Sequence, residues 1–178
     1  RFNWQTRPRR PVDNVTKLSL ERDTFANQLK AAGYATAMFG KWHLGSTPDY
    51  HPSKRGFDEA IESDGQHFDF KTTPKTEYPK GQYLADFLTD KAVDFIQRNQ
   101  AKPFLLYLPH FGVHSPFQAK SELVAKFKGK PGVGGHNSPT YAAMLASVDE
   151  SVGRVMAKLD ELKLADNTVI IFASDNGG

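Results

Sequence analysis

Three short apolar runs separated by stretches of helical periodicity constrain the fold of this chain more than any other feature. The runs occupy residues 34–39, 104–108 and 168–173. Runs of this length between helical segments predict buried β-strands. Because helices and strands alternate with the spacing of crossover units, we expect an α/β fold with a largely parallel sheet flanked by helices.

The segments between the runs carry recognisable helix patterns. Residues 24–32 predict a helix with Asp23 as its N-cap and Gly33 as its stop, and 82–99 places one apolar stripe at helical spacing. A short helix is expected over 120–127, and a long amphipathic helix spans the stripe 145–162. Residues 57–61 predict a short strand, and 1–17 predict a loop.

Polar residues follow each of the three apolar runs. Since the carboxyl ends of parallel strands share one edge of a sheet, these residues are expected to converge. Together they offer cationic donors for an anion, imidazoles that move protons near neutral pH, and hard oxygens for a divalent cation. The pattern predicts a site for a tetrahedral oxyanion ester, formed by Lys41, His43, His110, His114, Asp175 and Asn176.

Each of these residues also has a plainer interpretation. Asp175 and Asn176 precede two glycines, and taken alone this segment is better explained as a plain turn. Taken by itself, Lys41 is best explained as a solvent-exposed turn lysine, and the plainer interpretation of His43 is a structural histidine. Their position directly after a predicted strand, two residues apart, favours a functional role for both.

Three segments resemble those of a known family. Residues 33–45, Gly-Tyr-Ala-Thr-Ala-Met-Phe-Gly-Lys-Trp-His-Leu-Gly, closely resemble the second signature of the sulfatases, the arylsulfatase-type branch of the alkaline-phosphatase-like superfamily. Residues 174–178 resemble that family's second metal-binding segment, and 114–116 resemble its substrate-histidine loop. The order and separation of the three also match, and the resemblance covers nearly the whole chain.

The resemblance implies an alkaline-phosphatase-like sandwich and the hydrolysis of sulfate esters of aryl alcohols or carbohydrates. It implies that Lys41 binds the sulfate, that His43 holds the hydroxyl of a formylglycine nucleophile, and that His114 contacts the sulfate or the leaving oxygen. Asp175 and Asn176 would be ligands of a divalent metal, most often calcium.

Two further histidines are candidates for substrate binding. His110 matches the family pattern less specifically, and it either lines the substrate pocket or supports the site from behind. His67 falls where family members often place substrate-recognition groups, although a histidine on a surface loop explains it as well.

The expected nucleophile is missing from the sequence. Sulfatases make formylglycine from Cys or Ser in a Cys/Ser-x-Pro-x-Arg motif, whereas this chain has no cysteine and no Ser-x-Pro-x-Arg. In the family order the motif and an acidic metal pair would precede Arg1, and a further lysine would follow Gly178. We therefore expect residues 1–178 to be part of a sulfatase catalytic domain that is inactive by itself.

Composition limits the partners. The 178 residues, 39% hydrophobic and 24% charged, suit one soluble domain, and the net charge is +3. Arginines cluster near the N-terminus, but without aromatic interleaving they indicate a solvated segment, so no nucleic-acid partner is expected. No apolar run reaches about 18 residues, so no membrane segment is predicted. The resemblance implies a periplasmic, secreted or lysosomal location and says nothing of the oligomeric state.

Two alternatives stay open. A phosphatase or phosphodiesterase of the same superfamily would share the sheet and the metal edge, with a Ser or Thr nucleophile and commonly two metal ions; the Lys41-Trp42-His43 pattern argues against it. A non-catalytic protein that binds sulfated ligands would keep the pocket without the nucleophile.

Overall fold

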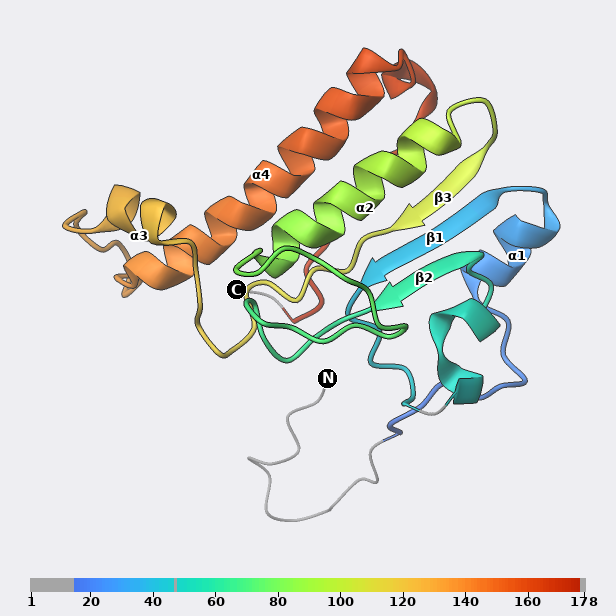
Figure 1. The fold of residues 1–178 in the computed structure, drawn as a ribbon, viewed down its shortest axis with the longest axis horizontal. Coiled ribbons are helices and arrows are strands. Elements are labelled where there is room, and N and C mark those ends of the chain that lie inside the picture. Colours follow the sequence, from blue (N-terminus) through green and yellow to red (C-terminus); the bar gives the residue numbers. More distant parts are fainter. Residues whose placement is uncertain (1–14, 47, 177–178) are drawn as a thin grey trace.

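The computed structural model describes residues 15–46 and 48–176. These described residues form three strands and four α-helices, which Figure 1 shows as a sheet with helices packed on it. The helices and strands are α1 (Phe25–Ala31), β1 (Ala35–Gly40), β2 (Glu59–Glu62), α2 (Leu84–Arg98), β3 (Phe104–Tyr107), α3 (Ser121–Phe127) and α4 (Pro139–Glu161). Short 3-10 helices cover Pro48–Tyr50, Pro52–Lys54 and Ala165–Asn167.

The sheet is parallel, with β1 in the middle and strand order β2-β1-β3. Ala37 faces Glu59 on one side of β1 and Leu106 on the other. After β2 the chain crosses the sheet through α2 and returns on the far side of β1 as β3, so all three strands end at the same edge (Figure 1). The predicted parallel α/β arrangement is thereby confirmed for the runs 34–39 and 104–108.

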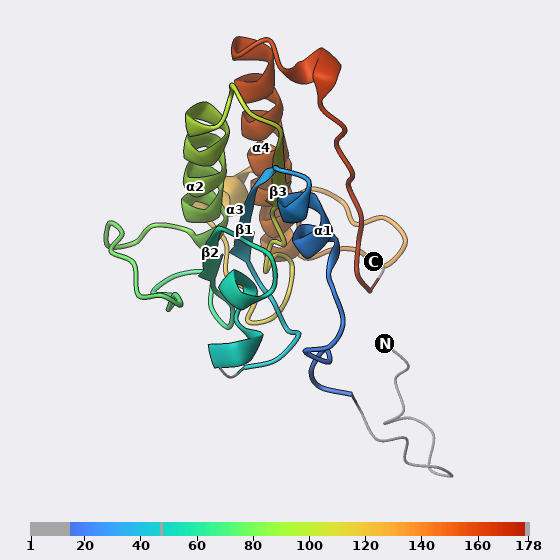
Figure 2. The same cartoon turned by 90° about the vertical axis from the view of Figure 1, so that its right-hand side faces the viewer.

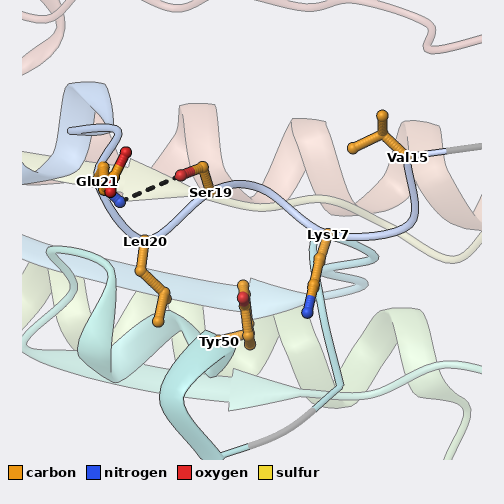
Figure 3. A pocket seen from close by; sticks show the side chains of 6 residues that line it. All are labelled: Val15, Lys17, Ser19, Leu20, Glu21 and Tyr50. Carbon is orange, nitrogen blue, oxygen red and sulfur yellow. Dashed lines mark hydrogen bonds between the residues drawn. The ribbon is translucent and has the colours of Figure 1, made fainter.

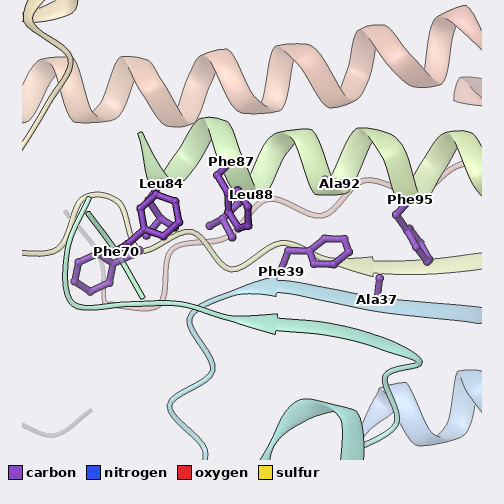
Figure 4. Close-up of a cluster of buried hydrophobic side chains, with 9 residues drawn as sticks. Ala37, Phe39, Phe70, Leu84, Phe87, Leu88, Ala92 and Phe95 are labelled. Atoms are coloured by element: carbon purple, nitrogen blue, oxygen red, sulfur yellow. The ribbon is translucent and has the colours of Figure 1, made fainter. Parts of the chain in front are cut away.

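The main core lies between the sheet and α2. Phe39 from β1 meets Phe95 from α2 with ring centroids 6.3 Å apart, and Leu88 and Ala92 fill the adjoining turns (Figure 4). These positions on α2 recur every three or four residues, which places one stripe of the helix on the sheet. The apolar stripe of 82–99 therefore has the role that its periodicity predicts.

A smaller core lies on the other face of the sheet, under α1. Met38, Trp42 and Phe57 pack there with Ala26 of the helix. The N-cap of α1 is Thr24, whose hydroxyl accepts from the backbone N–H of Asn27 while the Asn27 side chain accepts from the N–H of Thr24.

The prediction of Asp23 as N-cap is therefore wrong by one residue. Thr24 closes a reciprocal pair of hydrogen bonds with Asn27, and such a pair satisfies two backbone donors that a cap at Asp23 would leave open.

The third predicted strand is absent. Residues 168–173 form no strand, and Val169, Ile171 and Phe172 are 87%, 85% and 76% exposed. A parallel strand exists through hydrogen bonds to a neighbour, and this segment pairs with none of β1, β2 and β3. It runs apart from the sheet as an extended chain (Figure 2).

The long helix α4 begins at the cap Ser138, which accepts from the N–H of Tyr141, and has Pro139 in its first turn. It packs beside α2 and against α3 (Figures 1 and 2). No helix within the described ranges is long and apolar enough to cross a membrane.

Candidate functional site

Backbone hydrogen bonds join the loops that follow the three strands. Ser63 after β2 donates its N–H to the carbonyl oxygen of Gly40 over 3.0 Å, and Lys41 after β1 donates its N–H to the carbonyl oxygen of Pro109 over 2.8 Å. The loop after β1 is thus fixed between the other two. This is the edge at which the sequence predicts the site.

Within the central loop, Trp42 is the anchor. Its ring is buried against Phe57, and its indole N–H donates to the carbonyl oxygen of Tyr50 over 2.7 Å. Lys41 beside it is partly buried, with its ammonium 5.6 Å from the centre of the Phe111 ring. His43 is exposed and adopts a left-handed backbone conformation with φ of 59°. One buried residue therefore holds a cation and an imidazole on either side of it in the sequence.

His114 lies on the loop after β3 with its ring exposed. Its Nδ1 is 2.7 Å from the carbonyl oxygen of Ser115. Because a carbonyl oxygen can only accept, the proton of the neutral ring is on Nδ1, and Nε2 is left to accept from or, once protonated, donate to a ligand. The ring also packs on Phe111 with centroids 5.0 Å apart. Phe111 therefore contacts both Lys41 and His114.

His67 is not a surface loop histidine. Its side chain is 1% exposed, and its Nε2 is 2.9 Å from the carbonyl oxygen of His114. Burial lowers the pKa of the ring, which favours the neutral form. A ring so enclosed has no surface for a substrate, so the structure places His67 behind the loop that carries His114.

His110 faces α4 rather than the open edge. Its Nε2 lies 2.9 Å from the hydroxyl oxygen of Ser151. The Ser151 hydroxyl oxygen lies 2.6 Å from that of Thr89, and the Thr89 hydroxyl oxygen lies 2.5 Å from the carbonyl oxygen of Ala85. The Nδ1 of His110 is sealed from solvent without a partner. Burial lowers the pKa of His110 to about 4.

One arrangement of protons uses each donor in this series of hydrogen bonds once. His110 donates from Nε2 to Ser151, Ser151 donates to Thr89, and Thr89 donates to Ala85. The buried Nδ1 is then an unpaired acceptor, which costs less than an unpaired N–H. Of the two roles that the sequence allows for His110, the geometry favours support from behind.

Asp175 and Asn176 lie side by side at the end of the exposed segment. The Asn176 amide donates to the Asp175 carboxylate over 3.2 Å, and the charge of Asp175 adds to burial in raising the pKa of Tyr107 on β3. These oxygens suit a hard cation, but calcium takes six to eight ligands. Within 15–46 and 48–176, no three His, Cys, Asp or Glu side chains converge to hold a metal, so these residues do not form a complete metal site.

Two hollows lie near these loops. The smaller, of about 450 Å³, is lined by residues of the 15–21 segment and Tyr50, and none of the predicted site residues faces it (Figure 3). The larger, of about 1100 Å³, lies beside β2 and reaches the loop 63–66. Polar side chains such as Lys54, Glu62 and Lys71 predominate among its described lining residues, which include no Phe, Tyr or Trp.

Four residues that shape the site were not predicted from the sequence: Tyr83, Thr89, Phe111 and Ser151. Ser151 could have been found, because it lies four residues after Ser147 on the stripe of α4 that also carries Ala143, and a polar residue on a buried stripe needs a partner. Phe111 stands between two histidines and has no signal of its own. Its role follows from the ring contacts alone.

Comparisons with known proteins give a consistent result. The family model described as Sulfatase matches residues 3–178. The N-acetylgalactosamine-6-sulfatase of Canis lupus familiaris is 34% identical over 94% of this chain, and the arylsulfatase J of Mus musculus is 32% identical over 90%. These alignments cover 35% and 30% of the relatives, so the chain spans about a third of their length.

The fold is also found among solved structures. Ps i-CgsB, crystallised in complex with k-i-k-neocarrahexaose, matches 87% of this chain and 40% of its own with a TM-score of 0.75 and 29% identity. The putative sulfatase yidJ from Bacteroides fragilis matches 85% of the chain with a TM-score of 0.68 and 24% identity. The matched segment is thus part of a longer chain in each of these two proteins.

Proposed function

This chain belongs to the sulfatase family, and on that premise we propose that it is part of a sulfatase catalytic domain that hydrolyses sulfate esters. The expected alkaline-phosphatase-like fold agrees with that membership. The observation that supports the proposal is that Lys41 and His114 both lie against Phe111, since a cation and an imidazole beside one ring suit the binding of an anionic group.

Each residue has a role that its environment supports. The Lys41 ammonium balances negative charge on the sulfate oxygens as it grows in the transition state. His114 presents Nε2 to the sulfate or the leaving oxygen, because Ser115 holds its Nδ1 proton. His43, two residues from Lys41, orients the nucleophile. When present, a formylglycine supplies the attacking oxygen; this chain has no cysteine from which to form it.

Asp175 and Asn176 supply two oxygen ligands to a divalent metal, with calcium the expected ion. Sulfatases generally use such a metal, and adjacent carboxylate and amide oxygens suit calcium. Among the described residues, no group of three or more His, Cys, Asp or Glu side chains completes this pair. Addition of calcium to the full-length protein should raise its melting temperature, and Asp175→Ala should abolish that rise.

A sulfated carbohydrate is the favoured substrate class over an aryl sulfate. The hollow beside β2, which Lys41 and His114 do not line, offers carboxylate, ammonium and hydroxyl groups that hydrogen-bond to sugar hydroxyls, and its described lining residues include no aromatic ring of Phe, Tyr or Trp. Two matched proteins agree with this choice, one named for a sulfated amino sugar and one crystallised with an oligosaccharide. The family favours a periplasmic, secreted or lysosomal location.

The test is turnover by the full-length protein of a sulfated monosaccharide, an aryl sulfate and the corresponding phosphate ester. Lys41→Ala should lower kcat/KM for the sulfate ester about 10² to 10³-fold, the range for loss of one group that stabilises charge in the transition state. Lys126→Ala on the exposed side of α3 is the matched control and should change kcat/KM less than about two-fold.

Two results would overturn the proposal. Turnover of the phosphate ester without the sulfate ester would identify a phosphatase or phosphodiesterase of the superfamily. Binding of the sulfated sugar in calorimetry without any turnover would identify a binding protein that kept the pocket.

A further inference from the structure

His67 is enclosed by aromatic rings from two other segments. The ring lies parallel to that of Tyr83, at the start of α2, with centroids 5.6 Å apart, and 4.9 Å from that of Phe111 on the loop after β3. Its backbone carbonyl accepts from the N–H of Leu84, and its own N–H donates to the Gln118 side chain over 3.0 Å. His67 is therefore fixed between the loop after β2, the start of α2 and the loop after β3.

The shortest hydrogen bond of the ring is to the residue proposed to face the substrate. Nε2 of His67 lies 2.9 Å from the carbonyl oxygen of His114. Because that oxygen can only accept, the proton is on Nε2, and Nδ1 faces the hydroxyl of Tyr83 at 3.5 Å. The Tyr83 hydroxyl donates to the carbonyl oxygen of Gln118 over 2.9 Å. The segment 114–118 is thus held at both ends from the buried side.

These ties matter because the segment has no regular secondary structure. It lies in the connection between β3 and α3, where no helix or strand ladder fixes the backbone. The carbonyl group of His114 sits on the same backbone unit as its exposed ring. A donor that fixes this carbonyl therefore also limits the direction in which the ring can point.

We propose that His67 is a positioning residue that orients His114 by donating its Nε2–H to the carbonyl oxygen of His114. It contacts no substrate. Its effect on turnover rests on the proposed function, whereas its effect on the loop does not.

The competing explanation is that His67 only fills space in an aromatic cluster, and substitutions at this position separate the two. In His67→Gln the side-chain amide nitrogen replaces Nε2 as donor. In His67→Phe the stack on Tyr83 and Phe111 is kept and the donor is lost. His67→Leu also lacks the donor and is less bulky, so the donor-free state is tested even where one of the two variants fails to fold. His136→Phe, at an exposed histidine, is the matched control.

The measurements are hydrogen exchange of the backbone amides of 111–118 and steady-state kinetics with a sulfate ester, both in the full-length protein. The donor-free variants should speed exchange in 111–118 about ten-fold, because a buried carbonyl loses its partner. They should also lower kcat about ten-fold with a smaller change in KM, since the His114 ring is still present but no longer held in its orientation. His67→Gln should recover most of both losses, and His136→Phe should match the wild type.

Equal exchange in His67→Gln and the donor-free variants would overturn the inference, as would an unchanged loop in His67→Phe or His67→Leu. Should the wild type not turn over any sulfate ester, the proposed function fails, yet the exchange measurement still decides whether His67 holds the loop. The two failures are therefore distinguishable.

Discussion

Gly40, the last residue of β1, offers a sharp test of how the site loops are held together. Its φ of +138° lies where residues with a side chain are strained. A Cβ at this position would lie 2.1 Å from the carbonyl oxygen of Pro109, the same oxygen that accepts the N–H of Lys41 over 2.8 Å. Gly40→Ala should therefore force the loops after β1 and β3 apart.

The cost has three parts. The unfavourable backbone conformation costs about 1 to 3 kcal/mol. Relief of the overlap costs about 1 to 3 kcal/mol, and loss of the hydrogen bond from Lys41 to Pro109 costs about 1 kcal/mol. The free energy of unfolding should fall by about 3 to 7 kcal/mol, which for a domain of this size lowers Tm by about 6 °C or more.

Gly81→Ala isolates the conformational part. Gly81 has a φ of +80°, and an added Cβ there would have no heavy atom within 4 Å. This variant should lose about 1 to 2 kcal/mol. Urea unfolding of the wild type and both variants, followed by circular dichroism, gives the comparison. A loss in Gly40→Ala no larger than in Gly81→Ala would show that the predicted contact with Pro109 does not constrain the loops.

Other predictions concern the buried groups. Burial lowers the pKa of His110 to about 4 in the folded chain, whereas it is near 6.5 in the unfolded chain, so the unfolded state binds more protons between these pH values. The free energy of unfolding should therefore fall by up to about 3 kcal/mol as the pH drops from 6.5 to 4. His110→Gln should flatten this pH dependence in urea titrations. Phe95→Ala should cost about 3 to 5 kcal/mol by calorimetry, against less than about 1 kcal/mol for Phe117→Ala, which is 58% exposed; similar losses would contradict the assigned core. Thr89→Val should cost about 1 to 3 kcal/mol because Ser151 loses its acceptor, and an unchanged urea midpoint would refute the proposed proton arrangement.

Local patterns in the sequence were enough for most of the elements. The apolar stripe of 82–99 became α2, and the runs 34–39 and 104–108 became β1 and β3, because the side chains that specify these elements lie within a few residues of one another. The motif around Lys41 was readable for the same reason, since its spacing is fixed along a single loop.

Contacts between distant segments decided the rest. The sequence shows His67 on a polar loop, and only the packing of α2 and the loop after β3 encloses its ring. His110 likewise finds Ser151 forty-one positions away. Burial and hydrogen bonding of this kind depend on which surfaces meet, which no local spacing encodes.

The segment 168–173 shows the difference between what local sequence determines and what tertiary contacts decide. Its composition is that of a buried strand, and the sequence alone determined that preference. Whether such a run becomes a strand depends on a neighbouring backbone to accept and donate its hydrogen bonds. None of β1, β2 and β3 forms these hydrogen bonds with residues 168–173, so the segment is extended and exposed in the tertiary structure.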